Sequence, residues 1–422
     1  MYALIDGNTF YASCERVFQP KLNKRPVIVL SNNDGCVVTL TKEAKALGIK
    51  RGVPLFQIQE IVDRHDVAVF SSNYELYADM SDRMMQTIAT LVPEIHVYSI
   101  DECFACVDGM SELTDLTDLG RAIRARVLQW IGIPTCVGIA PTKTLAKYCN
   151  HLAKHYGALN GVLNWNDLTP ERQAKALACQ SVNEVWGVGA RLTERLNRLG
   201  IVSALDLARC PQPLLREHFP VTLLRTAQEL NGIDAIAFED ARESRAQIVR
   251  SRSFGEEVTD FDALRAAVIE HTQEAARVLR REGLSAQSLT AFIHSNRFKS
   301  DMPYYGTRTI DLGLARCDTA TLTRAAETSL KKIYRRGIAY KKAGVILTQL
   351  QKTESVTPDL FEAESYEKNQ RLSGVLDQIN DRFGKGTLVS AAVRVPQGAW
   401  KMKRDRLSPA YTTRLSDLLC VD

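Results

Sequence analysis

Short apolar runs alternate with amphipathic segments along the first 165 residues of the chain. Four runs have the length and the β-branched content of buried strands, at residues 2–5, 26–30, 36–40 and 134–139. A further apolar run predicts one more strand at residues 95–100. Apolar positions recur at helical spacing in five other segments, at residues 9–17, 41–47, 74–91, 116–130 and 142–155. Strands and helices that alternate in this way predict an α/β domain.

The pattern changes twice beyond residue 165. Between residues 168 and 232 the strand signals vanish, and short helices are predicted instead. After a polar linker, mixed signals return, with strands at residues 248–254, 288–294 and 343–350 and helices at 261–281 and 319–334. We assign this region the order β-α-β-β-α-β, which is typical of a small α+β domain. Beyond residue 351 the pattern is weak, and the polar, basic segments 400–406 and 408–414 indicate a docking tail rather than core.

Length and composition narrow the class of protein. A chain of 422 residues is too long for one ordinary core, so several domains are expected. No apolar run is long enough to cross a bilayer, and the start of the chain has no signal-peptide pattern, so no membrane role is expected. Most of the ten cysteines lie in apolar or helical patterns, which indicates free thiols in a cytoplasmic protein. Cys103 and Cys106 have C-x-x-C spacing, but no second ligand pair stands at zinc-finger distance.

Positive charge is concentrated in one region. The chain has a net charge of +5, whereas residues 245–342 alone carry 18 Lys and Arg against 11 Asp and Glu. A local basic excess is typical of a surface that binds a polyanion, although a merely solvated face gives the same count.

Acidic residues stand beside two of the predicted strands. Asp6-Gly7 follows the run at residues 2–5, and Asp101-Glu102 follows the run at residues 95–100. Carboxylates that meet across a sheet can hold hard divalent cations, and two such cations suit displacement at phosphorus. Asp6 taken alone is more often a turn residue or a helix cap, but two adjacent acids at the end of an apolar run have no obvious packing role.

A glycine hairpin lies in the predicted helical region. Trp186-Gly187-Val188-Gly189 precedes apolar residues at helical spacing, which fits a helix-hairpin-helix. Gly187 and Gly189 would let backbone N–H groups approach a phosphate that larger side chains would obstruct. Such contacts position a duplex without reading its sequence, and we favour this interpretation over an ordinary helical turn.

These segments together resemble the Y-family (translesion) DNA polymerases over nearly the full chain, and most closely the UmuC type, the catalytic subunit of bacterial DNA polymerase V or a plasmid-borne relative. The resemblance rests on Asp6-Gly7-Asn8-Thr9-Phe10-Tyr11, on Ser99-Ile100-Asp101-Glu102, and on residues 30–36, 70–80, 137–140 with Lys143 and Lys147, 186–189, 251–256 and 407–414. It implies a right-hand polymerase of mixed α/β and α+β class. The expected parts are a palm at residues 1–20 and 78–167, fingers at 21–77, a helical thumb at 168–235, a little finger at 243–350 and a partner-docking tail at 351–422.

The resemblance also implies roles for individual residues at the catalytic centre. Asp6, Asp101 and Glu102 match the metal-binding carboxylates, with the Gly7 carbonyl as an extra ligand. Two Mg²⁺ ions per active site are expected, with Mn²⁺ as a substitute. Tyr11 matches the steric gate that leaves no room for a 2′-hydroxyl, and Phe10 would support it; the alternative for Tyr11 is an ordinary core aromatic.

Further roles concern the nucleotide and the DNA. Four residues fall where the family contacts the triphosphate, namely Thr39, Lys42, Lys45 and Lys154. Many members carry Tyr and Arg where this chain has Lys42 and Lys45, which puts bidentate phosphate binding in doubt because lysine is a point charge. The expected DNA contacts are Gly187, Gly189, Arg250, Arg252 and Ser253, the last three on a strand that would follow the template backbone.

The expected function is error-prone, template-directed DNA synthesis across damage, without proofreading, as part of the DNA-damage (SOS) response. The alternatives are a catalytically inactive DNA-binding scaffold and a metal-dependent nuclease. Implied partners are primer-template DNA and dNTPs, a processed UmuD-like dimer, a RecA filament and the sliding clamp, in a cytoplasmic, nucleoid-associated setting. The clamp expectation rests on Leu360-Phe361, which keeps the usual ending of a clamp motif but lacks its Gln; a plain linker is the alternative.

Overall fold

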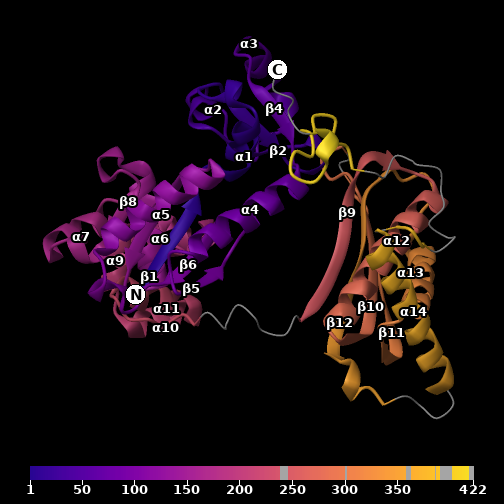
Figure 1. Cartoon of the computed structure of the whole chain (residues 1–422). Helices are drawn as coiled ribbons and strands as arrows, with labels where there is room; N and C mark the ends of the chain where they lie inside the picture. Colours follow the sequence, from indigo (N-terminus) through magenta and orange to yellow (C-terminus); the bar gives the residue numbers. More distant parts are fainter. Residues whose placement is uncertain (238–245, 300–301, 358–362, 385, 390–401, 418–422) are drawn as a thin grey trace. The chain divides into compact units, whose positions relative to one another are not determined.

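The computed structural model describes the chain except for residues 238–245, 300–301, 358–362, 385, 390–401 and 418–422. It divides into two compact units, one made of residues 1–241 with 405–422 and one of residues 242–404 (Figure 1). Each unit is considered by itself below. Among the described residues, no helix is both long and apolar enough to cross a membrane. All nine cysteines in the described part of the chain are free thiols, in keeping with the sequence pattern.

A five-stranded sheet forms the centre of the first unit, in the order β5-β6-β1-β7-β8. Its strands are β1 (Tyr2–Gly7), β5 (Glu94–Val97), β6 (Glu102–Cys106), β7 (Thr135–Ala140) and β8 (Val162–Asn164). β1 pairs antiparallel with both β6 and β7, while β7 and β8 run parallel. Because β1 lies in the middle, its side chains alternate between two packed faces.

Helices cover both faces of this sheet (Figure 1). They are α1 (Phe10–Phe18), α4 (Tyr74–Ala89), α5 (Leu116–Ile131) and α6 (Lys143–His155). Ala3 and Ile5 of β1 belong to the core shared with α1, α4 and α5, whereas Leu4 belongs to the core shared with α6. The alternation predicted from the sequence therefore produces a three-layer arrangement with the sheet in the middle.

A smaller sheet, in the order β3-β2-β4, has a hydrophobic core of its own. Its elements are β2 (Val27–Leu30), β3 (Val37–Leu40), α2 (Lys42–Ala46), α3 (Gln59–Arg64) and β4 (Ala68–Ser71). All four residues of β2 are buried, because the strand is central and packed on both sides.

Five short helices follow the main sheet, as the loss of strand signals predicts. They are α7 (Pro170–Ala178), α8 (Ala190–Arg198), α9 (Ala204–Arg209), α10 (Gln212–His218) and α11 (Val221–Leu230). Their apolar residues join α6 in one core, since Leu196, Leu207 and Leu215 are fully buried together with Cys149 of α6. The helices are thus packed directly on the helix that covers the main sheet.

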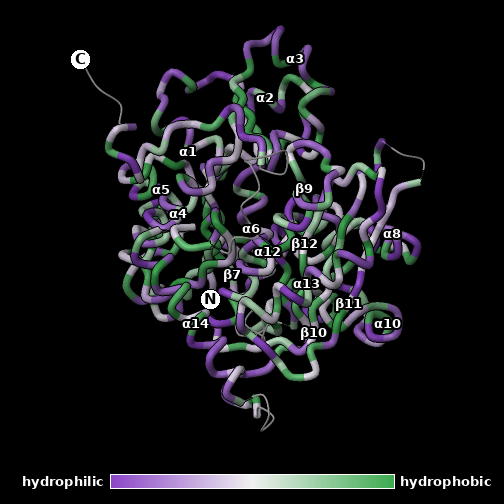
Figure 2. Tube along the Cα trace, turned by 90° about the vertical axis from the view of Figure 1, so that its right-hand side faces the viewer, coloured by the Kyte–Doolittle hydropathy of each residue, from purple (hydrophilic) through white to green (hydrophobic). Residues whose placement is uncertain are grey.

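The second unit is a four-stranded antiparallel sheet, in the order β11-β10-β12-β9, packed on two long helices. Its elements are β9 (Gln247–Val258), α12 (Phe261–Arg281), β10 (Leu284–Ser295), β11 (Tyr305–Arg316), α13 (Thr319–Ile333) and β12 (Tyr340–Lys352). Leu289 and Ile293 of β10 and Val345 and Leu347 of β12 lie in its core, and Figure 2 shows hydrophobic (green) and hydrophilic (purple) residues mixed along the tube. The order β-α-β-β-α-β agrees with the sequence analysis, which named no residues for the strand that is β11.

A 21-residue helix in the second unit was not predicted. α14 (Ala363–Phe383) packs beside α13, and its buried positions are Tyr366, Ser373 and Asn380. These positions recur every seven residues, but two of the three are polar. Apolar residues at helical spacing, Leu372, Val375 and Phe383, are exposed rather than packed against α13. Polar bonds hold it in place: Arg280 of α12 donates to both carboxylate oxygens of Asp377 at 2.6 and 2.8 Å.

One acidic segment lies in a turn rather than in a strand. The sequence analysis extends a strand over residues 95–100, whereas β5 ends at Val97 and β6 begins at Glu102. The backbone N–H groups of Tyr98 and Ser99 both donate to the carbonyl of Glu102 at 3.1 Å, which closes the turn. Asp101 therefore lies in the turn, where side chains do not have to alternate between two faces as they do in a strand.

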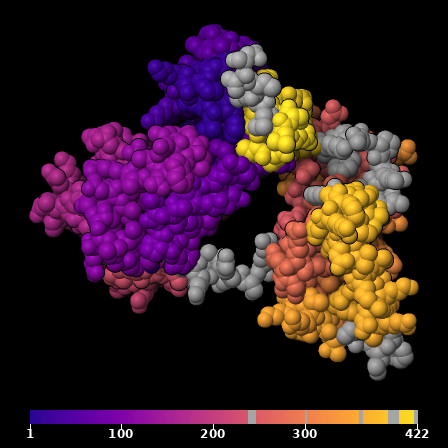
Figure 3. All heavy atoms as spheres, viewed as in Figure 1, coloured from indigo at the N-terminus to yellow at the C-terminus, as the bar shows by residue number. Residues whose placement is uncertain are grey.

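The end of the chain returns to the first unit. Ser408 and Tyr411 are only 6% and 4% exposed, and Tyr411 belongs to the core shared with α1 and α4. Figure 3 shows this segment (yellow) against the N-terminal part of the chain (indigo). The polar sequence of residues 408–414 gave no sign of this burial, because its side chains pack singly rather than with a repeating period.

Candidate active site

Strand register brings two of the three predicted carboxylates together. Asp6 at the end of β1 stands directly opposite Glu102 at the start of β6. The N–H of Gly7 donates to the carbonyl of Asp101 at 2.7 Å, so the turn that carries Asp101 is tied to the same strand end. Asp101 and Glu102 both act on the charge of Asp6, since each raises the pKa of its carboxyl group. The three acids therefore share one electrostatic site at the edge of the sheet.

The Asp101 carboxylate is oriented from within its own turn. Ser99 Oγ donates to Asp101 Oδ1 at 2.6 Å. Gly7 stands close to this turn, because a Cβ at position 7 would lie 3.0 Å from the Phe10 ring and 3.6 Å from the Asp101 carbonyl. The close approach of the Phe10 ring thus favours a glycine next to Asp6, whereas the distance to the turn would be an ordinary contact.

Two lysines of α6 neutralise the acidic residues. Lys154 Nζ lies 2.6 Å from Asp6 Oδ1, and Lys147 Nζ lies 2.8 Å from Glu102 Oε1. The two lysines are seven residues apart and share one helix face, as their spacing predicts. Lys143 lies on the same face but pairs with Asp234 at 3.0 Å and lies over the Tyr2 ring.

The ionisation of Asp6 is strongly perturbed. Burial raises the pKa of Asp6 from its ordinary value of 3.8 to about 6, and Asp101 and Glu102 add to the increase, although Lys154 lowers it. In such an environment the charged form of the carboxylate is unfavourable, and a bound cation would stabilise it. The site is therefore suited to bind positive charge beyond that of Lys154.

The donor set fits a hard divalent cation. In the described part of the chain, no three His, Cys, Asp or Glu side chains stand close enough together to form a metal-binding group. Lys154 and Lys147 instead hold the carboxylates of Asp6 and Glu102. Carboxylate and carbonyl oxygens are nevertheless the ligands that Mg²⁺ and Mn²⁺ prefer, and Asp6, Gly7, Asp101 and Glu102 supply only these.

Next to the acids lies an aromatic cluster formed by residues of α1 and α4. The Tyr11 ring is stacked on Tyr77 of α4 at 4.4 Å with an interplanar angle of 14°, and Tyr74 meets it edge-on at 6.2 Å. Phe10 is buried, whereas Tyr11 is only half-buried. Tyr11 therefore keeps one exposed side while its neighbours fix the plane of its ring.

A basic pocket lies beside this cluster. It has a volume of about 480 Å³, and its lining includes Thr9, which caps α1, together with Lys42 and Lys45 of α2. Lys50 and Arg51 complete the basic lining. Thr39 is buried on the neighbouring strand β3 and is not part of the lining, and Lys154 lies at Asp6. The structure thus brings together two of the four predicted triphosphate ligands and adds two cations from a turn whose sequence carries no periodic signal.

The predicted glycine hairpin forms, but its first helix is short. A single 3-10 turn at Val182–Glu184 precedes the hairpin, and α8 follows it. Gly187 adopts a φ of +85°, which side chains rarely tolerate. Gly189 is the N-cap of α8, and a Cβ there would meet nothing within 4 Å. The exposed start of α8 therefore presents free backbone N–H groups outward.

The predicted DNA contacts on β9 face different sides of the sheet. Arg250 and Arg252 stand between the buried Ile248 and Phe254, two residues apart each time. Positions two apart in a strand share one face, so the arginines lie on the face covered by α12. Both line a pocket with residues of α12, whereas the exposed Ser253 lies on the other face. Strand alternation separates the two arginines from Ser253, which the sequence order alone had grouped.

The candidate clamp motif and Lys147 remain to be located. Leu360 and Phe361, the candidate clamp motif, lie outside the described residues. Lys147 carries a contact that the sequence did not reveal, because it lies over the rings of Tyr98 at 4.3 Å and Trp186 at 5.3 Å. Trp186 of the glycine hairpin is thereby joined to the acidic site, and only the lysine spacing on α6 hinted at it.

Comparison with known proteins assigns three segments of the chain to families. Residues 5–151 match the impB/mucB/samB family, and residues 245–360 match its C-terminal domain. Residues 370–421 match a domain of unknown function, DUF4113.

Similar proteins cover the whole chain. Protein UmuC of Salmonella typhimurium is 45% identical over 100% of both chains. Protein MucB of Escherichia coli is 40% identical over 98% of this chain and 97% of its own. DNA polymerase IV 2 of Bacillus subtilis is 28% identical over 92% and 93% of the two chains.

Solved structures share the fold. A Y-family DNA polymerase chimera of Dbh and Dpo4 superimposes with a TM-score of 0.63 at 21% identity, over 82% of this chain and 98% of the chimera. The insertion ternary complex of Dbh DNA polymerase gives a TM-score of 0.52 at 21% identity, with the same coverage. The predicted Y-family polymerase fold is therefore confirmed. The two family matches, together with 45% identity to UmuC and 40% identity to MucB over nearly the full length, show that the chain belongs to the impB/mucB/samB family.

Proposed function

We propose that this protein is a DNA-directed DNA polymerase that copies damaged templates without proofreading. The observation that carries the proposal is the pairing of Asp6 with Glu102 across two strands, with each acid held by a lysine of α6. The aromatic cluster of Tyr11 follows Asp6 at the start of α1. Membership of the family and the Y-family fold support it. A nuclease would use similar acids but has no need of that aromatic cluster.

The acidic site would hold two divalent cations, Mg²⁺ or Mn²⁺, through Asp6, Asp101, Glu102 and the Gly7 carbonyl. Bound there, the cations would neutralise the triphosphate and favour loss of the proton from the primer 3′-hydroxyl. Asp6 and Glu102, which are now paired with Lys154 and Lys147, would be the ligands from these two strands. The ammonium groups of Lys154 and Lys147 would then be available to the negative charge on the phosphates.

Tyr11 would select the sugar of the incoming nucleotide. Its ring is fixed by stacking on Tyr77 and stands half-buried at the start of α1, where a bulky face excludes a 2′-hydroxyl by contact. Phe10 supports it from the core. The basic pocket lined by Lys42 and Lys45 lies next along the chain and would receive the triphosphate, with Lys50 and Arg51 as further cations.

The remaining chain would bind the primer-template duplex. Gly187 and Gly189 offer backbone N–H groups to a phosphate, and Ser253 lies on the uncovered face of the sheet in the second unit. Arg250 and Arg252 would reach the template backbone from the side of α12. In these terms we assign residues 1–20 and 78–167 to the palm, 21–77 to the fingers, 168–235 to the thumb, 243–350 to the little finger and 351–422 to the partner-docking tail.

The proposal includes the protein partners expected of this branch. They are a processed UmuD-like dimer, a RecA filament and the sliding clamp, in the nucleoid of the cytoplasm. Their binding is tested by association with the purified partners rather than by any feature of the active site.

Primer extension tests the activity. With Mg²⁺ and dNTPs, and with the UmuD-like dimer supplied, the full-length protein should extend a primer on an undamaged and on a lesion-bearing template. Asp101→Asn should abolish extension, whereas Asp63→Asn, which changes an exposed carboxylate on α3, should leave it intact.

The outcomes separate the proposals. Extension that persists in Asp101→Asn would refute the site assignment. DNA binding by the native protein without any extension would favour the inactive scaffold, and degradation of the primer would favour a nuclease.

A further inference from the structure

The C-terminal segment Asp405–Tyr411 is held in the first unit by specific hydrogen bonds. Two hydrogen bonds join Arg406 to Ser71 of β4. The Ser71 N–H donates to the Arg406 carbonyl at 2.9 Å, and the Arg406 N–H donates to the Ser71 side-chain oxygen Oγ at 3.0 Å. The N–H of Asp405 donates to Asp34 Oδ2 at 2.9 Å. The segment is therefore hydrogen-bonded to the end of β4, the strand that precedes α4.

Ser408 stands at the centre of these contacts. Asn73, whose side chain caps α4, donates to Ser408 Oγ at 3.0 Å and to the Ser408 carbonyl at 3.2 Å. Ser408 Oγ in turn donates to Glu15 Oε1 of α1 at 3.0 Å. One hydroxyl of the C-terminal segment thus joins the start of α4 to the middle of α1.

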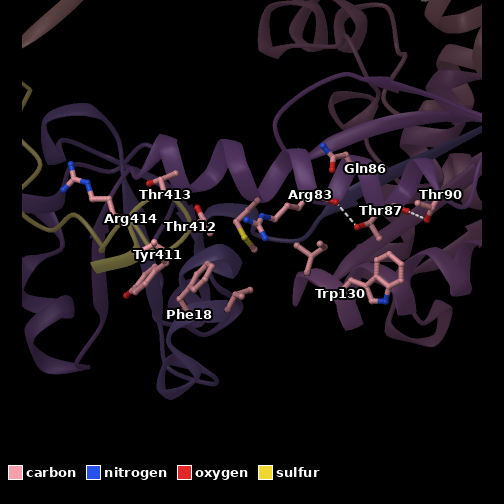
Figure 4. A pocket seen from close by; sticks show the side chains of 14 residues that line it. Phe18, Arg83, Gln86, Thr87, Thr90, Trp130, Tyr411, Thr412, Thr413 and Arg414 are labelled. Atoms are coloured by element: carbon pink, nitrogen blue, oxygen red, sulfur yellow. Dashed lines mark hydrogen bonds between the residues drawn. The ribbon is translucent and has the colours of Figure 1, made fainter. Parts of the chain in front are cut away.

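Tyr411 makes a second contact with α1. Its ring is stacked on Phe18 at 4.7 Å and 7°, and its hydroxyl accepts a bond of 3.1 Å from Gln19. The two rings lie together at one end of a groove of about 1080 Å³ that also reaches Trp130 of α5 (Figure 4). The segment therefore contacts α1 at two residues, Glu15 and Phe18, which lie almost one helical turn apart.

The contact at Glu15 leads directly to the aromatic cluster. Glu15 is completely buried, and its Oε1 accepts a second bond from the Tyr77 hydroxyl at 2.7 Å. The Tyr77 ring is the one on which Tyr11 is stacked. A continuous path of contacts therefore runs from Ser408 through Glu15 and Tyr77 to Tyr11.

Glu15 makes this path sensitive to the loss of a single hydroxyl. Its other oxygen, Oε2, has no hydrogen-bond partner in the described part of the chain. Burial raises the pKa of Glu15 to about 7, while the hydroxyls of Tyr77 and Ser408 oppose the increase. A buried carboxylate with few donors depends strongly on each of them.

We propose that Ser408 is a positioning residue for Tyr11, so that the C-terminal segment of the chain sets the sugar selectivity of the nucleotide site. The Ser408 hydroxyl holds Glu15, Glu15 holds the Tyr77 hydroxyl, and the Tyr77 ring fixes the plane of Tyr11. This inference rests on the proposed role of Tyr11 as the sugar gate. It assigns to the end of the chain, within a domain of unknown function, a task in substrate selection.

The test compares the incorporation of dNTPs and rNTPs by the full-length protein. In Ser408→Ala, kcat/KM for ribonucleotides should rise by about fivefold, the factor that corresponds to one hydrogen bond of ordinary net strength. Its kcat/KM for deoxynucleotides should stay within about twofold, because no group that contacts the substrate is changed. Ser416→Ala is the matched control: it makes the same change beyond Tyr411, where the exposed hydroxyl donates to Asp417 Oδ1.

A double-mutant cycle checks the path itself. Tyr77→Phe keeps the ring under Tyr11 but removes the other hydroxyl that Glu15 accepts, so it should also lower sugar selectivity. Ser408→Ala and Tyr77→Phe should combine to less than the product of their separate effects, because both act through Glu15. Ser416→Ala and Tyr77→Phe should combine as independent changes. If Ser408→Ala fails to fold, Tyr77→Phe alone decides: unchanged selectivity in it would overturn the proposal.

Tyr11→Ala separates this inference from the function on which it rests. If Tyr11→Ala admits ribonucleotides while Ser408→Ala and Ser416→Ala behave alike, the positioning role is wrong and the gate stands. If Tyr11→Ala leaves selectivity unchanged, the gate itself is wrong, and the inference falls with it.

Discussion

Asp6 should weaken the folded protein whenever it is ionised. Its pKa of about 6 lies well above the ordinary 3.8, chiefly because the carboxylate is buried, so the folded state holds the proton more tightly than the unfolded state does. At roughly 1.36 kcal/mol for each pH unit, this difference costs the folded protein ~3 kcal/mol at pH 8. The attraction of Lys154 is already contained in that pKa. A residue proposed to bind metal is thus a source of instability until positive charge arrives.

Asp6→Asn therefore should stabilise the metal-free protein in a pH-dependent manner. A raised pKa gives stability that is fully present below pH 4 and is lost as the pH rises through about 6. The variant lacks this loss, so it should match the native protein below pH 4 and exceed it by ~3 kcal/mol at pH 8. The same variant should have no polymerase activity.

Urea unfolding in the presence of a chelator measures this difference. Tryptophan fluorescence reports mainly on the relevant unit, since three of the four tryptophans, Trp130, Trp165 and Trp186, belong to it. Asp63→Asn is the control and should change neither the midpoint nor its pH dependence. Added Mg²⁺ should stabilise the native protein more than Asp6→Asn, because a ligand stabilises the form that binds it. Equal stability at pH 8, or the same gain at pH 4 and pH 8, would refute the reasoning.

Three further predictions follow from the structure. Tyr11→Ala should raise ribonucleotide incorporation while leaving Mg²⁺ binding intact, as measured by single-nucleotide kinetics and metal titration; unchanged sugar selectivity would contradict the gate. Gly138→Ala should unfold the first unit, because the new Cβ would lie 2.2 Å from backbone atoms of α6, whereas Gly157→Ala, with open space around it, should be neutral in thermal denaturation. Arg280→Met should free α14 by breaking the bidentate pair with Asp377, seen as faster amide exchange in α14, and retained protection would show that packing alone holds the helix.

Much of the fold could be predicted from local sequence patterns. The long helix α12 begins and ends at the predicted residues, Phe261 and Arg281, because its apolar positions repeat with a helical period over many turns. The three-layer core follows from the alternation along β1, where Ala3 and Ile5 face one side and Leu4 the other. Regular periods over several residues are what sequence reasoning detects.

Elements held by polar or isolated contacts escaped it. α14 buries Ser373 and Asn380, and the C-terminal segment buries Ser408 through bonds to residues more than 300 positions away. Buried polar residues leave no apolar pattern on the packed side, and their partners become known only when the fold has brought them together. The separation of Arg252 from Ser253 had a different cause, since a strand places neighbouring residues on opposite faces.

The candidate site shows the same division between local and distant information. The spacing of Lys147 and Lys154 predicts one helix face, but it does not say which acids that face meets; the strand register supplies that answer by placing Asp6 opposite Glu102. The lysines then have a consequence for catalysis. If the acids bind metal as proposed, that binding would break two ion pairs, and the two ammonium groups would become available to the triphosphate. Charge is thus exchanged within the site rather than created, so a polymerase of this design should bind metal and nucleotide with positive coupling.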